Sequence, residues 1–498
     1  MSAESAYARL EDRFRRLSAV QGALSVLHWD SAAVMPPGGA EVRGEQIAAL
    51  SLIAHEQITA PEMGDLIAAA GDETLGPWQQ ANLHEITRNW RHATAVPADL
   101  VEAIARQSHE TELTWRSARA ANDFASLAPR LQSLLDLVRQ VAAAKAAAFG
   151  LSPYDALLDE YEAGGRSARI DELFAELGAF LPELRARVIE RQSALPPSLP
   201  VEGPFPVPAQ QALAERILDV LQFDRAHGRL DVSHHPFTGG VPDDVRITTR
   251  YAEADFTRSL MGVIHETGHA QYERGLPLAW RSQPVGTARG MVLHESQSLL
   301  FEMQACRTPE FIGFLAPLVR EAFGRQGPAY EAANLQRIYH RVSPGLIRVD
   351  ADEVCYPSHV ILRYRLERAM IAGDLKVADL PGAWNQGMAD LLGITPPDDA
   401  DGCMQDIHWP GGSFGYFPTY TLGAMAAAQL FAAATAADSA ILPGIAAGDF
   451  RPLLAWLRPH VHEQGSSRTS DEILTAATGL PLGTAAFKAH LERRYLNG

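Results

Sequence analysis

Apolar residues recur every three or four positions along most of the chain, which is the period of an amphipathic α-helix. The pattern is clearest at residues 6–26, 131–149 and 171–193, where alanine and leucine, both strong helix formers, dominate. The alternation of period two that is typical of strands is scarce and is best seen at residues 244–249. The sequence therefore predicts an all-α class of fold, mostly helical, with a small β-sheet.

One long break interrupts the helical pattern. Residues 196–208 contain six prolines, and proline cannot continue a helix because it lacks the backbone N–H and clashes with the preceding turn. We predict one large helical domain over residues 1–498. The alternative is a subdivision near residues 194–210 into an N-terminal helical half and a C-terminal half that carries the chemistry.

Composition and charge narrow the class of protein. Apolar residues make up 47% and charged residues 21% of the 498 positions, values that are typical of a soluble folded chain. Lys and Arg number 43 against 60 Asp and Glu, and the net charge of −17 has the wrong sign for binding nucleic acid or an anionic membrane surface. We therefore expect no nucleic-acid partner and no membrane partner.

Cysteine usage and the apolar stretches bear on location. The three cysteines, Cys306, Cys355 and Cys403, are an odd number and too widely spaced for a disulfide framework. The N-terminal residues lack the apolar core of a signal peptide. Residues 424–437 are apolar but shorter than the roughly 20 residues that span a membrane, so we predict a buried helix there. The cysteine usage indicates a reducing compartment.

The string HETGH, an HExxH motif, carries the strongest chemical signal. On a helix of 3.6 residues per turn, His265 and His269 lie on one face, so both imidazoles can bind a single Zn²⁺. Glu266 then lies beside the metal without binding it. Asp255 is a predicted N-cap of this helix, and Gly275 is its predicted left-handed C-terminal glycine.

A catalytic zinc normally has three protein ligands and one open position, so a third ligand must come from elsewhere. Glu295 is the best candidate, since it lies on a second apolar helical segment that can pack against the first. His294 points about 100° away from Glu295 on a helix, and we expect it to contact a ligand or to face the substrate. A His₂Glu site also admits Co²⁺ or Mn²⁺ in place of zinc.

Six strings occur in a fixed order, and together they make the chain resemble the carboxypeptidase Taq family of zinc metallocarboxypeptidases. They are HPF at 235–237, DxRxT at 244–248, HExxH at 265–269, HESQ at 294–297, IRxxAD at 347–352 and GxxQDxHW at 402–409.

The resemblance covers nearly the whole chain. It implies an HExxH zinc peptidase-like helical fold, with the small sheet near the active-site groove and one divalent ion at the floor of that groove. It also implies a cytoplasmic enzyme, often a homodimer, that releases single C-terminal amino acids from peptides with broad specificity.

The residues suggest how the reaction is carried out. Zinc would activate a water molecule, and Glu266 would take its proton and then pass it to the departing amine. The oxyanion formed on the substrate needs a further hydrogen-bond donor. His408 and Tyr420 are the candidates, by similarity to related helical zinc peptidases, with Tyr416 as a weaker candidate for the same task or for substrate contact.

A carboxypeptidase must also bind a free terminal carboxylate, and the planar arginine fork suits that task. Arg348 is the first candidate, oriented by the flanking acids Asp350 and Asp352. Arg246 is the second, on a strand that we expect at an exposed edge, where it could pair with the peptide. His235 is a candidate for lining the substrate groove.

Other functions remain open at this point. HExxH with a distant glutamate also occurs in dipeptidyl carboxypeptidases and zinc oligoendopeptidases. A non-catalytic peptide-binding scaffold is a rival from another class, although such a protein has no chemical need for Glu266. Asp406 is a further candidate, as a hydrogen-bond acceptor for a ligand histidine.

Overall fold

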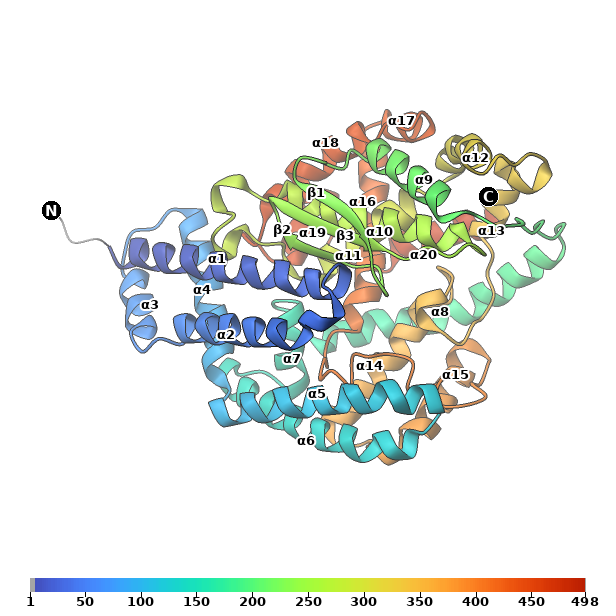
Figure 1. The fold of residues 1–498 in the computed structure, drawn as a ribbon. Coiled ribbons are helices and arrows are strands. Elements are labelled where there is room, and N and C mark those ends of the chain that lie inside the picture. The colour runs from blue at the N-terminus through green and yellow to red at the C-terminus, as the bar shows by residue number, and fades with distance from the viewer. Residues whose placement is uncertain (1–4, 498) are drawn as a thin grey trace. The chain divides into compact units, whose positions relative to one another are not determined.

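Helices make up most of the chain, as the apolar period predicts, and one small sheet interrupts them (Figure 1). The computed structural model describes residues 5–497. The chain forms two compact units, each assembled from three stretches of sequence. The first unit contains residues up to Ala93, Ser198–Tyr339 and Ala426–Leu482, and the second contains Thr94–Pro197, His340–Met425 and the residues from Gly483 onward.

The helices divide between these units, with two of them crossing a boundary. Those of the first unit are α1 (Ala6–Ala33), α2 (Ala40–Ile58), α3 (Met63–Gly71), α4 (Pro77–Ala95), α9 (Val207–Val220), α10 (Phe256–Gly275), α11 (Gly290–Leu299), α12 (Pro309–Phe323), α13 (Ala332–Tyr339), α17 (Ile441–Ala446), α18 (Arg451–His460) and α19 (Ser470–Thr478). Those of the second are α5 (Ala98–Ala121), α6 (Phe124–Phe149), α7 (Pro153–Tyr161), α8 (Ser167–Ser193), α14 (Tyr356–Ala372), α15 (Leu380–Leu392) and α20 (Ala485–Glu492). α4 ends just beyond one boundary, and α16 (Pro418–Ala437) contains another.

Short 3₁₀ and π-helical turns join these elements. The 3₁₀ turns are η1 (Pro37–Gly39), η2 (Leu278–Trp280), η3 (Pro284–Gly286), η5 (Pro328–Tyr330), η6 (Arg348–Asp350), η7 (Val377–Asp379) and η8 (His462–Gln464). The π-helical turns are η4 (Leu300–Ala305) and η9 (Arg493–Asn497).

The proline-rich segment coincides with one unit boundary, between Pro197 and Ser198. The units themselves differ from an N-terminal and a C-terminal half, because the chain passes from one to the other several times. The sequence pattern marks where a helix must stop, but it does not show which distant stretches pack together.

The sheet lies in the first unit and has three strands, β1 (Gly228–Val232), β2 (Thr238–Val241) and β3 (Asp244–Thr249), in the order β1-β3-β2. β3 pairs with β1 in parallel and with β2 in antiparallel orientation. The expectation of an exposed edge strand at residues 244–249 is therefore wrong. Val245 and Ile247 are buried, and both sides of the strand are already hydrogen-bonded, so β3 has no free edge for a peptide.

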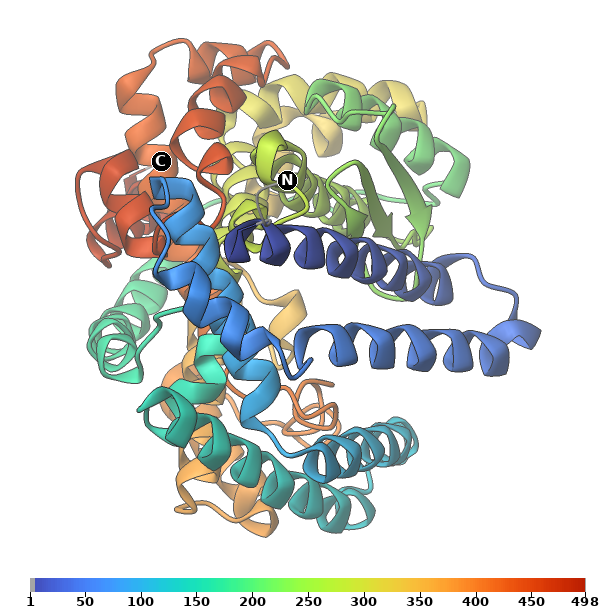
Figure 2. The same cartoon turned by 90° about the vertical axis from the view of Figure 1, so that its left-hand side faces the viewer.

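Two apolar clusters stabilise the first unit. One joins α1, α3 and α4, and in both views α1 runs alongside α2 (Figures 1 and 2). The other packs α10 against β3 and α9 through Ala214, Leu218, Phe223, Val245, Ile247, Val263 and Ala270. This second cluster covers the side of α10 that faces the sheet. It thereby fixes the orientation of α10 and of His265 and His269 on the opposite side of the helix.

One helix, α16, is long and apolar enough to cross a membrane by length and composition. Its apolar window is 61% buried within the protein, as in the core helices of folded domains. The predicted burial of residues 424–437 agrees with this finding.

Candidate metal centre

The helix that carries the HExxH string begins as predicted and ends differently. The Asp255 side chain accepts a hydrogen bond of 2.8 Å from the backbone N–H of Thr257, so it is the N-cap of α10. Gly275 is not a left-handed residue after the helix but the last helical residue. A Cβ there would lie 2.4 Å from Nδ1 of the buried His462, so glycine is required by close packing.

A second glycine brings the next helix close. A Cβ at Gly268 would lie 2.5 Å from the carbonyl oxygen of Gln297 and 2.6 Å from the Cα of Ser298. Only glycine permits this approach of α11 to α10. The contact places Glu295, two residues before Gln297, opposite the two histidines.

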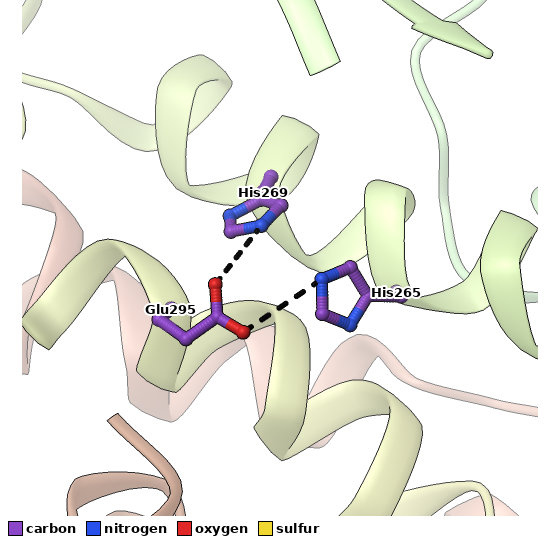
Figure 3. Close-up of side chains that lie close together, drawn as sticks. All are labelled: His265, His269 and Glu295. Carbon is purple, nitrogen blue, oxygen red and sulfur yellow. Dashed lines mark ion pairs between the residues drawn. The ribbon is translucent and has the colours of Figure 1, made fainter. Parts of the chain in front are cut away.

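The three predicted ligands converge (Figure 3). Nε2 of His265 lies 3.9 Å from Oε1 of Glu295, and Nε2 of His269 lies 3.6 Å from Oε2 of the same carboxylate. Tetrahedral zinc with bonds of about 2.0–2.2 Å places its ligand atoms roughly 3.3 Å apart. The spacing therefore fits a divalent ion after small side-chain adjustments, and within residues 5–497 this is the one such group of potential ligands.

Each ligand histidine has a second partner on its other ring nitrogen. Nδ1 of His265 lies 3.0 Å from Oε2 of Glu302, and Arg307 donates a hydrogen bond to the other oxygen of Glu302. Nδ1 of His269 lies 2.7 Å from Nδ1 of His294. Such contacts orient the rings of metal-binding histidines.

Glu302 is not among the site residues predicted from the sequence. A signal was available, since Glu302 follows Glu295 by seven residues, about two helical turns, and so falls near the same face. The π-helical turn η4 that contains Glu302 changes the local geometry and weakens that inference.

Glu266 lies beside the ligands and is 5% exposed. Its Oε2 accepts a hydrogen bond of 2.6 Å from the hydroxyl of Thr238 on β2. Burial raises the pKa of Glu266 above its usual value, against the opposing effects of His265 and Thr238. Thr238 is a second residue that is not predicted from the sequence, because no local pattern links a strand residue to a helix residue 28 positions later.

The charges around the ligands favour a cation. Burial by itself lowers the pKa of an imidazole, but Glu302, with Glu295 and Glu266 nearby, outweighs it and raises the pKa of His265 to about 10. Burial, together with His294 and His265, lowers the pKa of His269 well below its usual value. Three carboxylates thus hold a positive charge next to a neutral imidazole, and a divalent ion can take the place of the proton on His265.

The second unit brings together other predicted site residues. Nε2 of His408 lies 3.1 Å from the hydroxyl of Tyr420. The ring of Tyr416 lies 5.1 Å from that of Tyr420 and 5.6 Å from that of His408, measured between centroids. The guanidinium of Arg348 lies 4.9 Å from the centre of the Tyr420 ring. These four residues form one cluster, which we call the His408 cluster.

Asp406 orients Arg348. Oδ1 of Asp406 accepts hydrogen bonds from Nε and Nη2 of Arg348, at 3.1 and 2.9 Å, and Oδ2 accepts one of 2.6 Å from Arg363. Asp352 instead accepts from the backbone N–H groups at the start of α14. The interpretation of Asp406 as an acceptor for a ligand histidine is wrong, because the second ring nitrogens of His265 and His269 contact Glu302 and His294 instead.

The remaining candidates lie in the first unit. Arg246 donates two hydrogen bonds to Asp244, at 2.9 and 2.6 Å, and its guanidinium lies 4.6 Å from the centre of the Trp29 ring. This guanidinium is thus already paired with a carboxylate. His235 is exposed in the loop between β1 and β2, and its carbonyl oxygen accepts a hydrogen bond from the Ser233 hydroxyl.

A mostly helical fold with an HExxH pair, a glutamate from the next helix and a buried glutamate beside them defines an HExxH metallopeptidase. Residues 9–495 match the family described as carboxypeptidase Taq (M32) metallopeptidase. The chain therefore belongs to this family and is a metallocarboxypeptidase.

The chain is similar to curated relatives and to solved structures over nearly its whole length. Thermostable carboxypeptidase 1 of Thermus thermophilus is 37% identical, over 99% of each chain. The structure of Trypanosoma cruzi metallocarboxypeptidase 1 is 44% identical, with a TM-score of 0.96 over 99% of each chain. That of the M32 carboxypeptidase from Deinococcus radiodurans R1 is 34% identical, with a TM-score of 0.94 over 98% of each chain.

Proposed function

We propose that this enzyme releases single amino acids from the free C-termini of peptides, with broad specificity and with one zinc ion per chain. The observation that supports this most strongly is the convergence of His265, His269 and Glu295, with Glu266 beside them. Co²⁺ or Mn²⁺ can serve in the same ligand set.

A divalent ion held by these three residues supplies Lewis acidity, which acidifies water and polarises the scissile carbonyl. Glu266 removes the proton from the attacking water and later gives it to the nitrogen of the leaving amino acid. Thr238 binds one oxygen of the Glu266 carboxylate, which leaves the other to exchange the proton.

We assign the oxyanion donors to His408 and Tyr420, with Tyr416 as an alternative. Burial, with Arg348 nearby, lowers the pKa of His408 to about 3, so its imidazole is neutral at pH 7 and one ring nitrogen carries a proton. The hydrogen bond between His408 and Tyr420 holds the two polar groups together. A preorganised pair of this kind stabilises developing negative charge more effectively than mobile groups do.

We assign recognition of the terminal carboxylate to Arg348. Two of its three guanidinium nitrogens bind one oxygen of Asp406, so Nη1 lies outside that pair. Arg246 is the less favourable candidate, because its guanidinium already donates hydrogen bonds to both carboxylate oxygens of Asp244. His235 remains a candidate for contact with the substrate.

The substitution Arg348→Lys tests this assignment and keeps the positive charge next to Asp406. Loss of a charge-assisted hydrogen bond costs about 1.5–3 kcal/mol, so we expect KM for free peptides to rise roughly 10- to 100-fold. Steady-state kinetics on a tripeptide measures this, with Arg246→Lys as the matched variant. An unchanged KM in Arg348→Lys together with a raised KM in Arg246→Lys would transfer the role to Arg246.

Two experiments test the carboxypeptidase activity: removal of the metal, and the use of a peptide whose C-terminus is blocked. A free peptide should be shortened by one residue at a time, and chelation should abolish the reaction until zinc is returned. The same peptide with a C-terminal amide should stay intact. Mass spectrometry distinguishes the alternatives: an oligoendopeptidase cleaves the amide, a dipeptidyl carboxypeptidase releases dipeptides, and a peptide-binding scaffold gives no product.

We further propose a cytoplasmic homodimer that acts on peptides, as the family resemblance implies. The three cysteines are free and buried, which is compatible with a reducing compartment. The net charge of −17 favours peptides over nucleic acid as partners.

A further inference from the structure

Three residues form a chain of contacts that leads away from the metal centre. Nδ1 of His269 lies 2.7 Å from Nδ1 of His294, and Nε2 of His294 lies 2.8 Å from Oε1 of Glu273. Glu273 is one helical turn after His269 on α10, while His294 comes from α11 and lies between them. We call this chain the Glu273 relay.

The chemistry of the relay permits one arrangement of protons. His269 directs Nε2 toward Glu295, so this nitrogen must be free of a proton when it binds a metal, and the proton must lie on Nδ1. Nδ1 of His269 is then the donor and Nδ1 of His294 the acceptor. His294 consequently has its proton on Nε2, where it donates to the Glu273 carboxylate.

The reverse arrangement is unfavourable at both ends. It would place a proton on the metal-binding nitrogen of His269, and it would direct a lone pair of His294 at a carboxylate oxygen 2.8 Å away. Glu273 thus determines the tautomer of His294, and His294 in turn determines the tautomer of His269.

We propose that Glu273 and His294 are positioning residues that hold His269 in its metal-binding tautomer. The two ligand histidines are therefore supported in different ways. His265 has a direct carboxylate partner, Glu302, whereas His269 reaches its carboxylate through a second imidazole. This inference rests on the proposed metal centre, and it adds a role for His294, the histidine of the HESQ string.

Zinc affinity of the metal-free protein tests the relay without a measurement of activity. His294→Phe keeps the ring but removes the acceptor, and we expect it to weaken zinc binding about 10- to 100-fold, as loss of such supporting contacts does. His294→Asn returns an oxygen acceptor near the position of Nδ1 and should bind zinc within about threefold of the native protein. The zinc affinity of Glu273→Leu should lie between those of His294→Phe and His294→Asn. A chromophoric competing chelator reports each dissociation constant.

His460→Phe is the matched control, because His460 stacks on Trp456 in the same unit and should leave the affinity unchanged. The absorption spectrum of the Co²⁺-substituted protein gives a second readout, which should change in His294→Phe and match the native spectrum in His294→Asn.

Equal zinc affinity in the native protein and His294→Phe would overturn the relay, as would equal loss in His294→Phe and His294→Asn. If His294→Phe does not fold, Glu273→Leu decides, and native affinity in that variant would also overturn the relay. Failure of the native protein to bind one zinc ion would instead contradict the proposed metal centre.

Discussion

Glu266→Gln is expected to lose about 10²–10⁴-fold in kcat while it keeps a full complement of zinc. The amide has nearly the same size as the carboxylate and can still accept the hydrogen bond from Thr238, but it cannot take up a proton at neutral pH. Because Glu266 is not a ligand, the three residues that hold the metal are unchanged. Peptide hydrolysis and metal analysis on the same preparation measure both quantities.

Glu253→Gln is a suitable control, because Glu253 is exposed just before α10. It should retain native activity and native metal content. Near-native activity in a zinc-loaded Glu266→Gln enzyme would show that another group moves the proton. Loss of zinc from that variant would show that Glu266 holds the metal, which also contradicts its assigned role.

Asp406→Asn is expected to lower the free energy of unfolding by about 3–5 kcal/mol, the usual cost of removing one partner from a buried ion pair. Arg363 is fully buried and Arg348 nearly so, and Asp406 is the carboxylate that both of them bind. Burial opposes ionisation of Asp406, but Arg363 and Arg348 outweigh it and hold the pKa of the carboxyl well below its usual range.

The sign of the pH dependence follows from the direction of that shift. A carboxyl whose pKa is lower in the folded state stabilises the fold above its ordinary pKa and loses this contribution as the pH falls through the folded value. The free energy of unfolding should therefore differ most between the native protein and Asp406→Asn at pH 7, and the difference should become smaller in strong acid. Denaturant unfolding followed by circular dichroism measures it.

Asp374→Asn provides the comparison, because Asp374 is an exposed aspartate of the same unit. It should unfold like the native protein. If Asp406→Asn and Asp374→Asn unfold at the same denaturant concentration, Asp406 does not hold the two arginines together.

The sequence is most informative where a short-range pattern determines the structure. The period of the apolar residues identifies the helices, and the i, i+4 spacing alone places His265 and His269 on one face. Glu295 is predictable because the chemistry of zinc requires a third ligand and because its segment is helical. Asp255 is predictable from the preference of helix N-termini for short polar side chains.

The sequence fails where a role depends on which distant segments meet. The central position of β3 is not predictable, because β1 and β2 contain glycines and little alternation and neither is recognisable as a strand. Asp352 is near Arg348 in sequence but accepts backbone N–H groups, whereas Asp406, 58 residues after Arg348, binds the guanidinium. Glycine often follows the end of a helix, which is the role the sequence suggests for Gly275. The structure shows that glycine is required there by close contact with His462, which no local pattern reveals.

The central claim is that His265, His269 and Glu295 bind one metal ion, and anomalous diffraction at the zinc edge tests it most directly. We predict a single strong peak within about 2.0–2.2 Å of Nε2 of both histidines and of a Glu295 carboxylate oxygen. A peak elsewhere in the molecule, or a bound ion with the Glu295 side chain directed away from it, would contradict the account.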